Sequence, residues 1–553
     1  MDAPASAGPF DRAKALGRLA AEELDVLVIG GGITGAGVAL DAATRGLRTG
    51  LVERDDFASG TSSKSSKLVH GGLRYLQQRE IGLVYEGLAE RQVALRNAPH
   101  LVRVLPFLIP LFTKDGLISR RLARALGSAM WMYDLTGGLR IGKRHRRIAA
   151  DEALGHMQSL RPDRVAGAYL YYDAHTDDAR FTLAVARTAA AHGAVIANYA
   201  GVTSLRKDAA GRVNGARVQA NGDEIEVRAR AVVNAAGVWA DDVRALDEGG
   251  HPHSIRPAKG IHITVPWSKV RNDIAVVLPV AKDRRSVFVV PWGDLTYVGT
   301  TDTDYDGPLD DPKCTPEDVA YLLGALNAAI TQPLDESDVL GTWAGLRPLL
   351  RTASSERTAD LSRKHEVRHS ASGLITINGG KLTTYRRMAA DTVAAVDALL
   401  GERRRSRTKR LPLLGAEGFE PPPPTNEPSR HAHLAGRYGT EAAMVEALVD
   451  DDPQLGEPLV PGLPYLRAEA VHAVRHEMAR TLDDVLSRRT RARLLARDDS
   501  AAVADDVAAL LAPELGWDDA ERARQVKEYR AAVAAERDAA HLPETALDAA
   551  LGA

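Results

Sequence analysis

Residues 25–54 read DVLVIGGGITGAGVALDAATRGLRTGLVER, and this stretch decides the fold of the first part of the chain. The apolar run at 25–29 predicts a buried parallel strand. It ends in a G-x-G-x-x-G motif that opens a helix, with the residues Gly30, Gly32, Ile33, Thr34 and Gly35. Gly30 permits a tight turn, Gly32 lets the main chain approach a pyrophosphate, and Gly35 allows close packing of helix on strand. The helix N-terminus offers free N–H groups to an anion.

A second predicted strand, residues 49–53, ends in Glu53. An acid at the end of this strand is placed to accept hydrogen bonds from the hydroxyl groups of a ribose. A glycine motif alone is weak evidence, because glycine-rich turns also occur without a ligand. Strand, helix, second strand and terminal acid together indicate a dinucleotide-binding site.

The composition limits the class of protein. A chain of 553 residues is too long for one core, so we expect several domains. The net charge of −2 gives no general attraction to nucleic acid, and we expect no nucleic-acid partner. Cys314 is the single cysteine, which excludes an internal disulfide and a multi-cysteine metal site. Because no stretch is typical of a signal peptide or a spanning helix, we expect a cytoplasmic protein, or one lying on a membrane from that side.

A run rich in serine and glycine follows Glu53 and reads in isolation as a flexible loop. Because it directly follows the predicted ribose acceptor, its hydroxyls and amides are candidates to bind phosphates or a ring edge. The candidates are Thr61, Ser62, Ser63, Lys67, Leu68, His70, Gly71 and Gly72.

The α/β pattern returns twice later in the chain. Residues 178–198 predict a helix and a strand, 201–230 a short β-meander, and 231–239 a buried strand that runs into small residues. There Ala236, Gly237 and Trp239 are candidate cofactor contacts, with a plain tight turn as the alternative. A last strand at 374–378 precedes a helix start whose candidate contacts are Gly380, Lys381, Leu382 and Thr383.

Six blocks resemble the FAD-dependent glycerol-3-phosphate dehydrogenases. Beside the first strand motif they are TSSKSSKLVHGGLRYL at 61–76, VVNAAGVWAD at 232–241, PWGDLTYVGTTDTDY at 291–305, GLRPLL at 345–350 and NGGKLTTYRRMA at 378–389. The similarity runs from about residue 23 into HEMARTLDDVLSRRTR at 476–491, which resembles the helical domain appended in that family. The resemblance implies non-covalent FAD, and it places a main-chain contact to the adenine at Val202.

The fold expected is α/β, with a Rossmann-like FAD-binding domain of the glutathione-reductase and D-amino-acid-oxidase type. An antiparallel β-sheet substrate cap interrupts it, and an all-α C-terminal domain follows. We assign 20–98, 172–254 and 346–400 to the FAD-binding domain, 99–171 and 255–345 to the cap, 401–425 to a linker and 426–553 to the helical domain.

The resemblance implies oxidation of sn-glycerol 3-phosphate to dihydroxyacetone phosphate, with hydride transfer to flavin N5 and electrons passed to membrane quinone. The N-terminus of the helix that begins after residues 379–384 supplies a positive end for the charge that develops on the flavin. Arg74 and Arg347 are the candidate phosphate ligands, because guanidinium groups bind a dianion in pairs of hydrogen bonds, with Tyr75 and Lys381 beside them. His262 is the candidate base, and Lys381 or Arg347 is the alternative group at the alkoxide.

Three other functions stay open. The first is an oxidase of the same substrate that uses oxygen, and the second is an oxidase of an amine or amino acid. The third is a flavin-binding regulatory module without turnover. Anaerobic bleaching of the flavin and the peroxide yield in air distinguish them.

The expected partners are the substrate, quinone and a membrane surface, and a homodimer is the candidate assembly. Residues 117–135 predict a helix whose apolar face carries Met130 and Tyr133 while Arg120, Arg121 and Arg124 lie off it. This helix either lies in the membrane interface or packs on its own domain. His472 and His476 have metal-ligand spacing, but no third ligand is evident, and we expect no metal.

Overall fold

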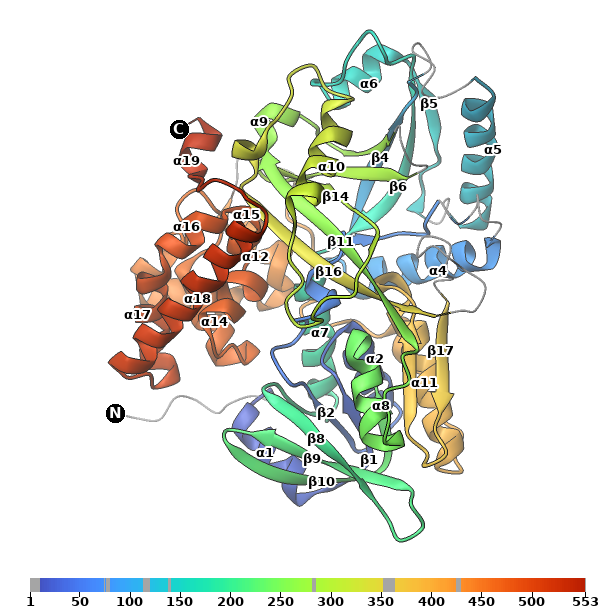
Figure 1. The fold of residues 1–553 in the computed structure, drawn as a ribbon, viewed down its shortest axis with the longest axis vertical. Coiled ribbons are helices and arrows are strands. Elements are labelled where there is room, and N and C mark those ends of the chain that lie inside the picture. The colour runs from blue at the N-terminus through green and yellow to red at the C-terminus, as the bar shows by residue number, and fades with distance from the viewer. Residues whose placement is uncertain are drawn as a thin grey trace.

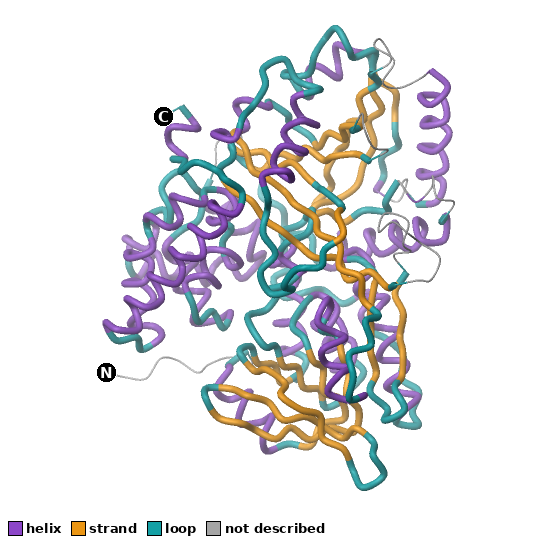
Figure 2. The backbone as a smooth tube through the Cα atoms, viewed as in Figure 1, coloured by secondary structure: helices purple, strands orange, loops and turns teal. Residues whose placement is uncertain are grey.

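The structure, a computed structural model, describes residues 10–73, 75, 80–112, 120–137, 141–280, 285–351, 364–423 and 429–552. Two β-sheets, one above the other in Figures 1 and 2, form the centre of the molecule, and the C-terminal helices gather along one side. The α/β fold with an appended helical region, expected from the sequence, is confirmed.

The first sheet is built around the strand of the glycine motif. Its order is β17-β18-β10-β1-β2-β7, with β9 paired to β10 and β8 to β9. The strands are β1 (Glu23–Ile29), β2 (Thr49–Val52), β7 (Val195–Ala197), β8 (Ala200–Lys207), β9 (Val213–Ala220), β10 (Asp223–Asn234), β17 (His365–His369) and β18 (Ile375–Gly379). From β18 through β10, β1 and β2 to β7, neighbouring strands are parallel, so their carboxyl ends meet at one edge.

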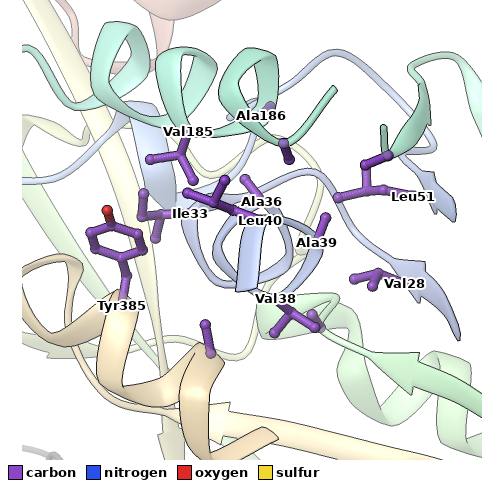
Figure 3. Packing of buried hydrophobic residues seen from close by; sticks show 14 of the residues in the cluster. Val28, Ile33, Ala36, Val38, Ala39, Leu40, Leu51, Val185, Ala186 and Tyr385 are labelled. Atoms are coloured by element: carbon purple, nitrogen blue, oxygen red, sulfur yellow. The ribbon is translucent and has the colours of Figure 1, made fainter. Parts of the chain in front are cut away.

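Helices and the meander bury both faces of this sheet, which explains why residues 26–29 are all apolar. On one face Val26 and Val28 pack with α2 (Ile33–Thr44), α7 (Asp178–Ala191) and α11 (Tyr385–Leu399). In Figure 3, α2 lies between α7, which carries Val185, and α11, which carries Tyr385, and Ile33 of α2 lies between these two side chains. On the other face Leu24 and Leu27 pack with α1 (Arg12–Ala21) and the meander.

The second sheet is largely antiparallel. Its order is β15-β11-β14-β13-β12-β4-β6-β3, with β16 paired to β11 and β5 to β6. The strands are β3 (Leu68–Val69), β4 (Arg103–Pro110), β5 (Arg146–Ile148), β6 (Ala168–His175), β11 (Ile255–Pro266), β12 (Ala275–Pro279), β13 (Ser286–Trp292), β14 (Leu295–Gly299), β15 (Thr303–Asp304) and β16 (Gly341–Leu350). Ile261 and Ile263 of β11 pack with residues of α10 (Pro316–Asn327), and aromatic side chains gather on another part of the sheet.

The C-terminal residues form helices throughout, as expected. They are α12 (Arg430–Tyr438), α13 (Ala442–Asp451), α14 (Arg467–Glu477), α15 (Ala492–Leu495), α16 (Arg497–Ala502), α17 (Ala504–Leu515), α18 (Asp519–Ala539) and α19 (Leu547–Leu551). The other α-helices described are α4 (Ile81–Asn97), α5 (Arg120–Thr136), α6 (Ala150–His156), α8 (Ala240–Glu248) and α9 (Trp267–Val270).

The boundaries assigned to the domains stay a prediction. Most strands of the first sheet fall within the ranges assigned to FAD binding, and most strands of the second within those assigned to the cap. Three strands depart from this division. The last residues of β6, the last residues of β16 and all of β3 lie in the second sheet, although the sequence assigns them to the FAD-binding domain. The loop that follows β2 therefore crosses from one sheet to the other.

Candidate functional site

A cavity of about 360 Å³ lies at the carboxyl ends of the parallel strands. Ile29 ends β1, Glu53 follows β2, Ala235 follows β10 and Gly379 ends β18, and all four residues line it. This edge is where open α/β sheets bind ligands, because loops and helix N-termini converge there.

Glycine is required at two positions of the turn between β1 and α2. Gly30 has φ +110°, and a Cβ there would lie 2.7 Å from the carbonyl oxygen of Ala235. A Cβ on Gly35 would lie 1.9 Å from the carbonyl oxygen of Gly30, so the helix can approach the strand only without a side chain. The sequence predicts this close packing, and the structure confirms it.

Glu53 holds its carboxylate at the cavity through two main-chain amides. The N–H of Gly31 donates to Oε2 at 2.5 Å, and the N–H of Asp55 donates to Oε1 at 2.9 Å. Burial raises the pKa of Glu53 to about 7, although both hydrogen bonds oppose the shift. Each carboxyl oxygen keeps a second lone pair for a hydroxyl donor from a ligand.

Most of the predicted cofactor residues converge on this cavity. Its lining includes Gly30, Gly32, Ile33, Thr34, Glu53, Thr61, Ser62, Val202, Ala236, Gly237, Trp239, Gly380, Lys381 and Leu382. The sequence missed Ser59 and Gly60, which belong to the same serine-rich run, and Asp242 and Leu246 of α8, which carry no motif. A cleft built from two glycine turns, a held carboxylate and the start of α2 fits a dinucleotide.

The other predicted cofactor residues, Gly35, Ser63, Lys67, Leu68, His70, Gly71, Gly72 and Thr383, are not among those that line the cavity. The side chain of Lys67 forms an ion pair with Asp178 at 2.8 Å. Leu68 lies in β3 of the second sheet, and the N–H of His70 donates to Thr383 Oγ1 at 3.1 Å. Their contact with a cofactor stays a prediction.

One stretch of β11 and β16 carries the candidate catalytic groups. In the register of these strands His262 lies opposite Trp343, Gly260 opposite Gly345 and Ala258 opposite Arg347. Because side chains alternate along a strand, Gly260 and His262 share a face with Trp343 and Arg347. Thr61 Oγ1 donates to the carbonyl of Leu346 at 2.5 Å, and Pro348 lines the cavity, so this stretch lies next to the cavity.

Neighbouring residues fix the ring of His262. The indole of Trp343 stacks on it, with ring centroids 4.7 Å apart, and Gly299 on the other neighbouring strand leaves room for it. Ser66 Oγ lies 2.9 Å from Nε2, while Nδ1 is buried without a hydrogen-bond partner in the described part of the chain. Burial, and then the charges of Lys67 and Arg347, hold the pKa of His262 well below its usual value, so the ring is neutral near pH 7.

Arg347 points its guanidinium over Gly260, where a Cβ would lie 2.5 Å from Nη2. Asp302 pairs with Nη1 at 3.2 Å, and Nη2 donates to Thr300 Oγ1 at 3.1 Å. The ammonium of Lys381 lies 3.7 Å from the ring centroid of Tyr75. Arg74 lies outside the described residues. The sequence missed Ser66 and Asp302, although both belong to blocks that it singled out.

Two family models match the chain. Residues 25–386 match the FAD dependent oxidoreductase model, and residues 406–522 match the C-terminal domain of alpha-glycerophosphate oxidase. These matches cover both sheets and most of the helical region.

The relatives agree with the models. Glycerol-3-phosphate dehydrogenase 2 of Mycobacterium tuberculosis is 43% identical over 96% of this chain and 92% of its own. The human mitochondrial glycerol-3-phosphate dehydrogenase is 38% identical over 92% of this chain and 73% of its own. The crystal structure of glycerol-3-phosphate dehydrogenase from Bacillus halodurans, complexed with FAD, is 32% identical over 94% of this chain and 96% of its own, with a TM-score of 0.75. The chain therefore belongs to the FAD-dependent oxidoreductases, and within them to the glycerol-3-phosphate dehydrogenase family.

Proposed function

We propose that this protein oxidises sn-glycerol 3-phosphate to dihydroxyacetone phosphate with FAD bound in the cavity. The observation that carries the proposal is the common face of His262 and Arg347 beside a cavity with a dinucleotide-binding turn. The substrate is inferred from the names of the relatives. His262 is the candidate base for it, and Arg347 is the candidate cation for its phosphate.

The cavity residues would hold the two halves of FAD. Glu53 would accept hydrogen bonds from the ribose hydroxyls, the start of α2 would bind the pyrophosphate, and Val202 would contact the adenine. Residues 380–383, which directly precede α11, would lie near the ring system, and the first three of them line the cavity. Bound FAD supplies at N5 the acceptor for the hydride that leaves C2 of the substrate.

The substrate's phosphate would be bound by Arg347, with Arg74, Lys381 and Tyr75 as the other ligands. Asp302 and Thr300 hold the guanidinium of Arg347 in one orientation, so less rotamer freedom is lost when the phosphate binds. His262 takes the proton of the C2 hydroxyl. With Nε2 donating to Ser66 Oγ, Nδ1 carries the lone pair that accepts this proton.

We further propose that the electrons pass to quinone at a membrane surface on the cytoplasmic side. None of the described helices is long and apolar enough to cross a membrane. Met130 and Tyr133 of α5 are buried within the protein, which favours domain packing for the apolar face noted in the sequence. The side chains of Arg120, Arg121 and Arg124 lie outside the described residues.

Other apolar side chains of α5 and its neighbour α4 are exposed. Trp131 and Leu135 are 52% and 75% exposed, and Ile81 and Tyr85 of α4 are 47% and 53% exposed. In Figure 1 α5 stands at the edge of the molecule opposite the C-terminal helices. An aromatic and aliphatic group of this kind suits the interfacial region of a bilayer. We take it as the membrane contact.

Replacing Glu53 by alanine removes the acceptor for the ribose hydroxyls. We expect FAD to bind more weakly by about 1–3 kcal/mol, because the ribose hydroxyls lose their hydrogen-bond acceptor. Flavin released during dialysis of the purified variant measures this. The matched control is Glu226→Ala on the exposed part of β10. Unchanged flavin retention in the Glu53 variant would contradict the assignment.

Arg347→Lys keeps the positive charge but loses the bidentate hydrogen bonding of the guanidinium, and Arg347→Ala loses both. We expect kcat/KM for glycerol 3-phosphate to fall roughly 30- to 1,000-fold, more for alanine than for lysine, because a charge-assisted pair worth about 2–4 kcal/mol is removed. Glycerol, which has no phosphate, is the control substrate and should be a poor one that hardly responds to either change. Equal fractional losses on both substrates would mean that Arg347 supports the flavin or the fold instead.

Trp131→Ser combined with Leu135→Ser should weaken binding to vesicles of phosphatidylcholine and phosphatidylglycerol. The expected loss is roughly 30-fold or more, because the two apolar side chains together contribute about 2–6 kcal/mol when buried. Co-sedimentation measures it, and Leu399→Ser with Met444→Ser, exposed on α11 and α13, is the control pair. If both pairs behave like the unmodified protein, the membrane contact is elsewhere.

A further inference from the structure

Residues 488–493 are a segment of the C-terminal helical region, and three of its arginines contact the loop that follows β2 or the start of α7. Arg489 donates to both carboxyl oxygens of Asp56, at 2.6 and 2.7 Å, and Arg488 donates to the same residue at 2.6 Å. Asp56 is fully buried, so these cations come from another part of the chain to balance a charge that has no contact with water.

Arg491 extends this contact towards the candidate active site. Its guanidinium forms ion pairs with Asp177 and Asp178, at the start of α7, and donates to the carbonyl of Ser63. The side chain is fully buried. The planar guanidinium can serve two carboxylates and a carbonyl at once, which an ammonium group serves less well.

Asp178 in turn holds the loop itself. Its Oδ2 accepts from the N–H of Ser65 at 2.9 Å and from the hydroxyl of Ser65 at 2.7 Å. Its Oδ1 accepts from Lys67 Nζ at 2.8 Å. The loop at 63–67 is therefore wrapped around one buried carboxylate, whose charge is shared between Lys67 and Arg491.

The opposite side of this loop meets the catalytic candidates. Ser66 Oγ lies 2.9 Å from His262 Nε2, and Tyr297 donates to the carbonyl of Ser66 at 2.9 Å. Trp343, which stacks on His262, donates from Nε1 to the carbonyl of Ser65 at 3.2 Å. A shift of the loop would thus change the hydrogen bond that orients His262.

We propose that Arg491 is a positioning residue. Through it the C-terminal helical region holds the loop at 63–67 in place, so that the hydrogen bond with Ser66 keeps the ring of His262 in its orientation. The part of this inference that concerns turnover rests on the proposed role of His262. The part that concerns the loop rests on the contacts alone. A buried carboxylate that loses one of its two cations must take up water, a proton or a new partner, and each of these weakens the hydrogen bonds by which it holds the loop.

The test compares Arg491→Ala and Arg491→Lys with a matched control, Arg493→Ala, in the full-length FAD-loaded protein. Arg493 belongs to the same segment, but its guanidinium binds Glu536 at 3.0 Å, Asp483 at 3.0 Å and the carbonyl of Ala532 at 3.1 Å, all within the C-terminal region. Three quantities are measured. They are the hydrogen exchange of amides 63–67, the rate at which glycerol 3-phosphate reduces the flavin without oxygen, and the melting temperature.

We expect Arg491→Ala to speed amide exchange at 63–67 and to slow flavin reduction about 10- to 100-fold, the size of effect that a misplaced catalytic group produces. KM should change less than the reduction rate, and Arg491→Lys should recover part of the loss. Arg493→Ala should lower the melting temperature without changing exchange in the loop or the reduction rate. Unchanged exchange at 63–67 in Arg491→Ala, or equal losses of rate in Arg491→Ala and Arg493→Ala, would overturn the proposal.

A second variant keeps the test decisive if Arg491→Ala does not fold. Ser65→Ala removes the hydroxyl that Asp178 holds and leaves Arg491 with both of its carboxylates. Exchange at 63–67 should rise and flavin reduction should slow about 10-fold, again as for a misplaced group. Unmodified loop exchange and rate in this variant would refute the proposal. If glycerol 3-phosphate fails to reduce the flavin of the unmodified protein, the proposed function is wrong, and the exchange data still decide the role of Arg491.

Discussion

The close approach of α2 to β1 is the constraint on which the rest of the site depends. A side chain on Gly35 would meet the carbonyl of Gly30, and one on Gly30 would meet Ala235, so both strand ends and the helix start can converge only with glycine at these positions. The convergence creates the cavity and brings Glu53 within reach of the Gly31 amide. The packing of α2 between α7 and α11 then places the start of α11 at the same edge.

The two sheets are joined where the chemistry is proposed to occur. The loop that follows β2 lines the cavity with Thr61 and Ser62 and then enters the second sheet as β3. β16 carries Arg347 and Trp343 and binds the same loop through Leu346. Buried arginines of the C-terminal region contact this loop from the side opposite His262. The neutral state of His262 follows from this crowding, because burial and two nearby cations oppose its protonation.

Much of the fold could be predicted from local patterns. The residues that form the glycine motif, and those that form each apolar strand, lie within a few positions of each other in the sequence. Side-chain partners were harder to predict. Lys67 was expected to contact the cofactor, yet its ammonium pairs with Asp178, more than a hundred positions away. The arginines that meet Asp56 are over four hundred positions from it. The pattern of residues in a single sequence does not indicate which distant residues form such ion pairs. Because these pairs link the C-terminal helical region to the loop after β2, no role for that region is predicted from the sequence.

The central claim is that the cavity holds a flavin which a phosphorylated alcohol reduces. Anaerobic titration of the FAD-loaded protein, followed by the visible absorbance of the flavin, tests it directly. The account predicts that sn-glycerol 3-phosphate bleaches the flavin fully, whereas glycerol and glycine leave it oxidised over the same period. Bleaching by glycine instead, or by none of the three, would contradict the account.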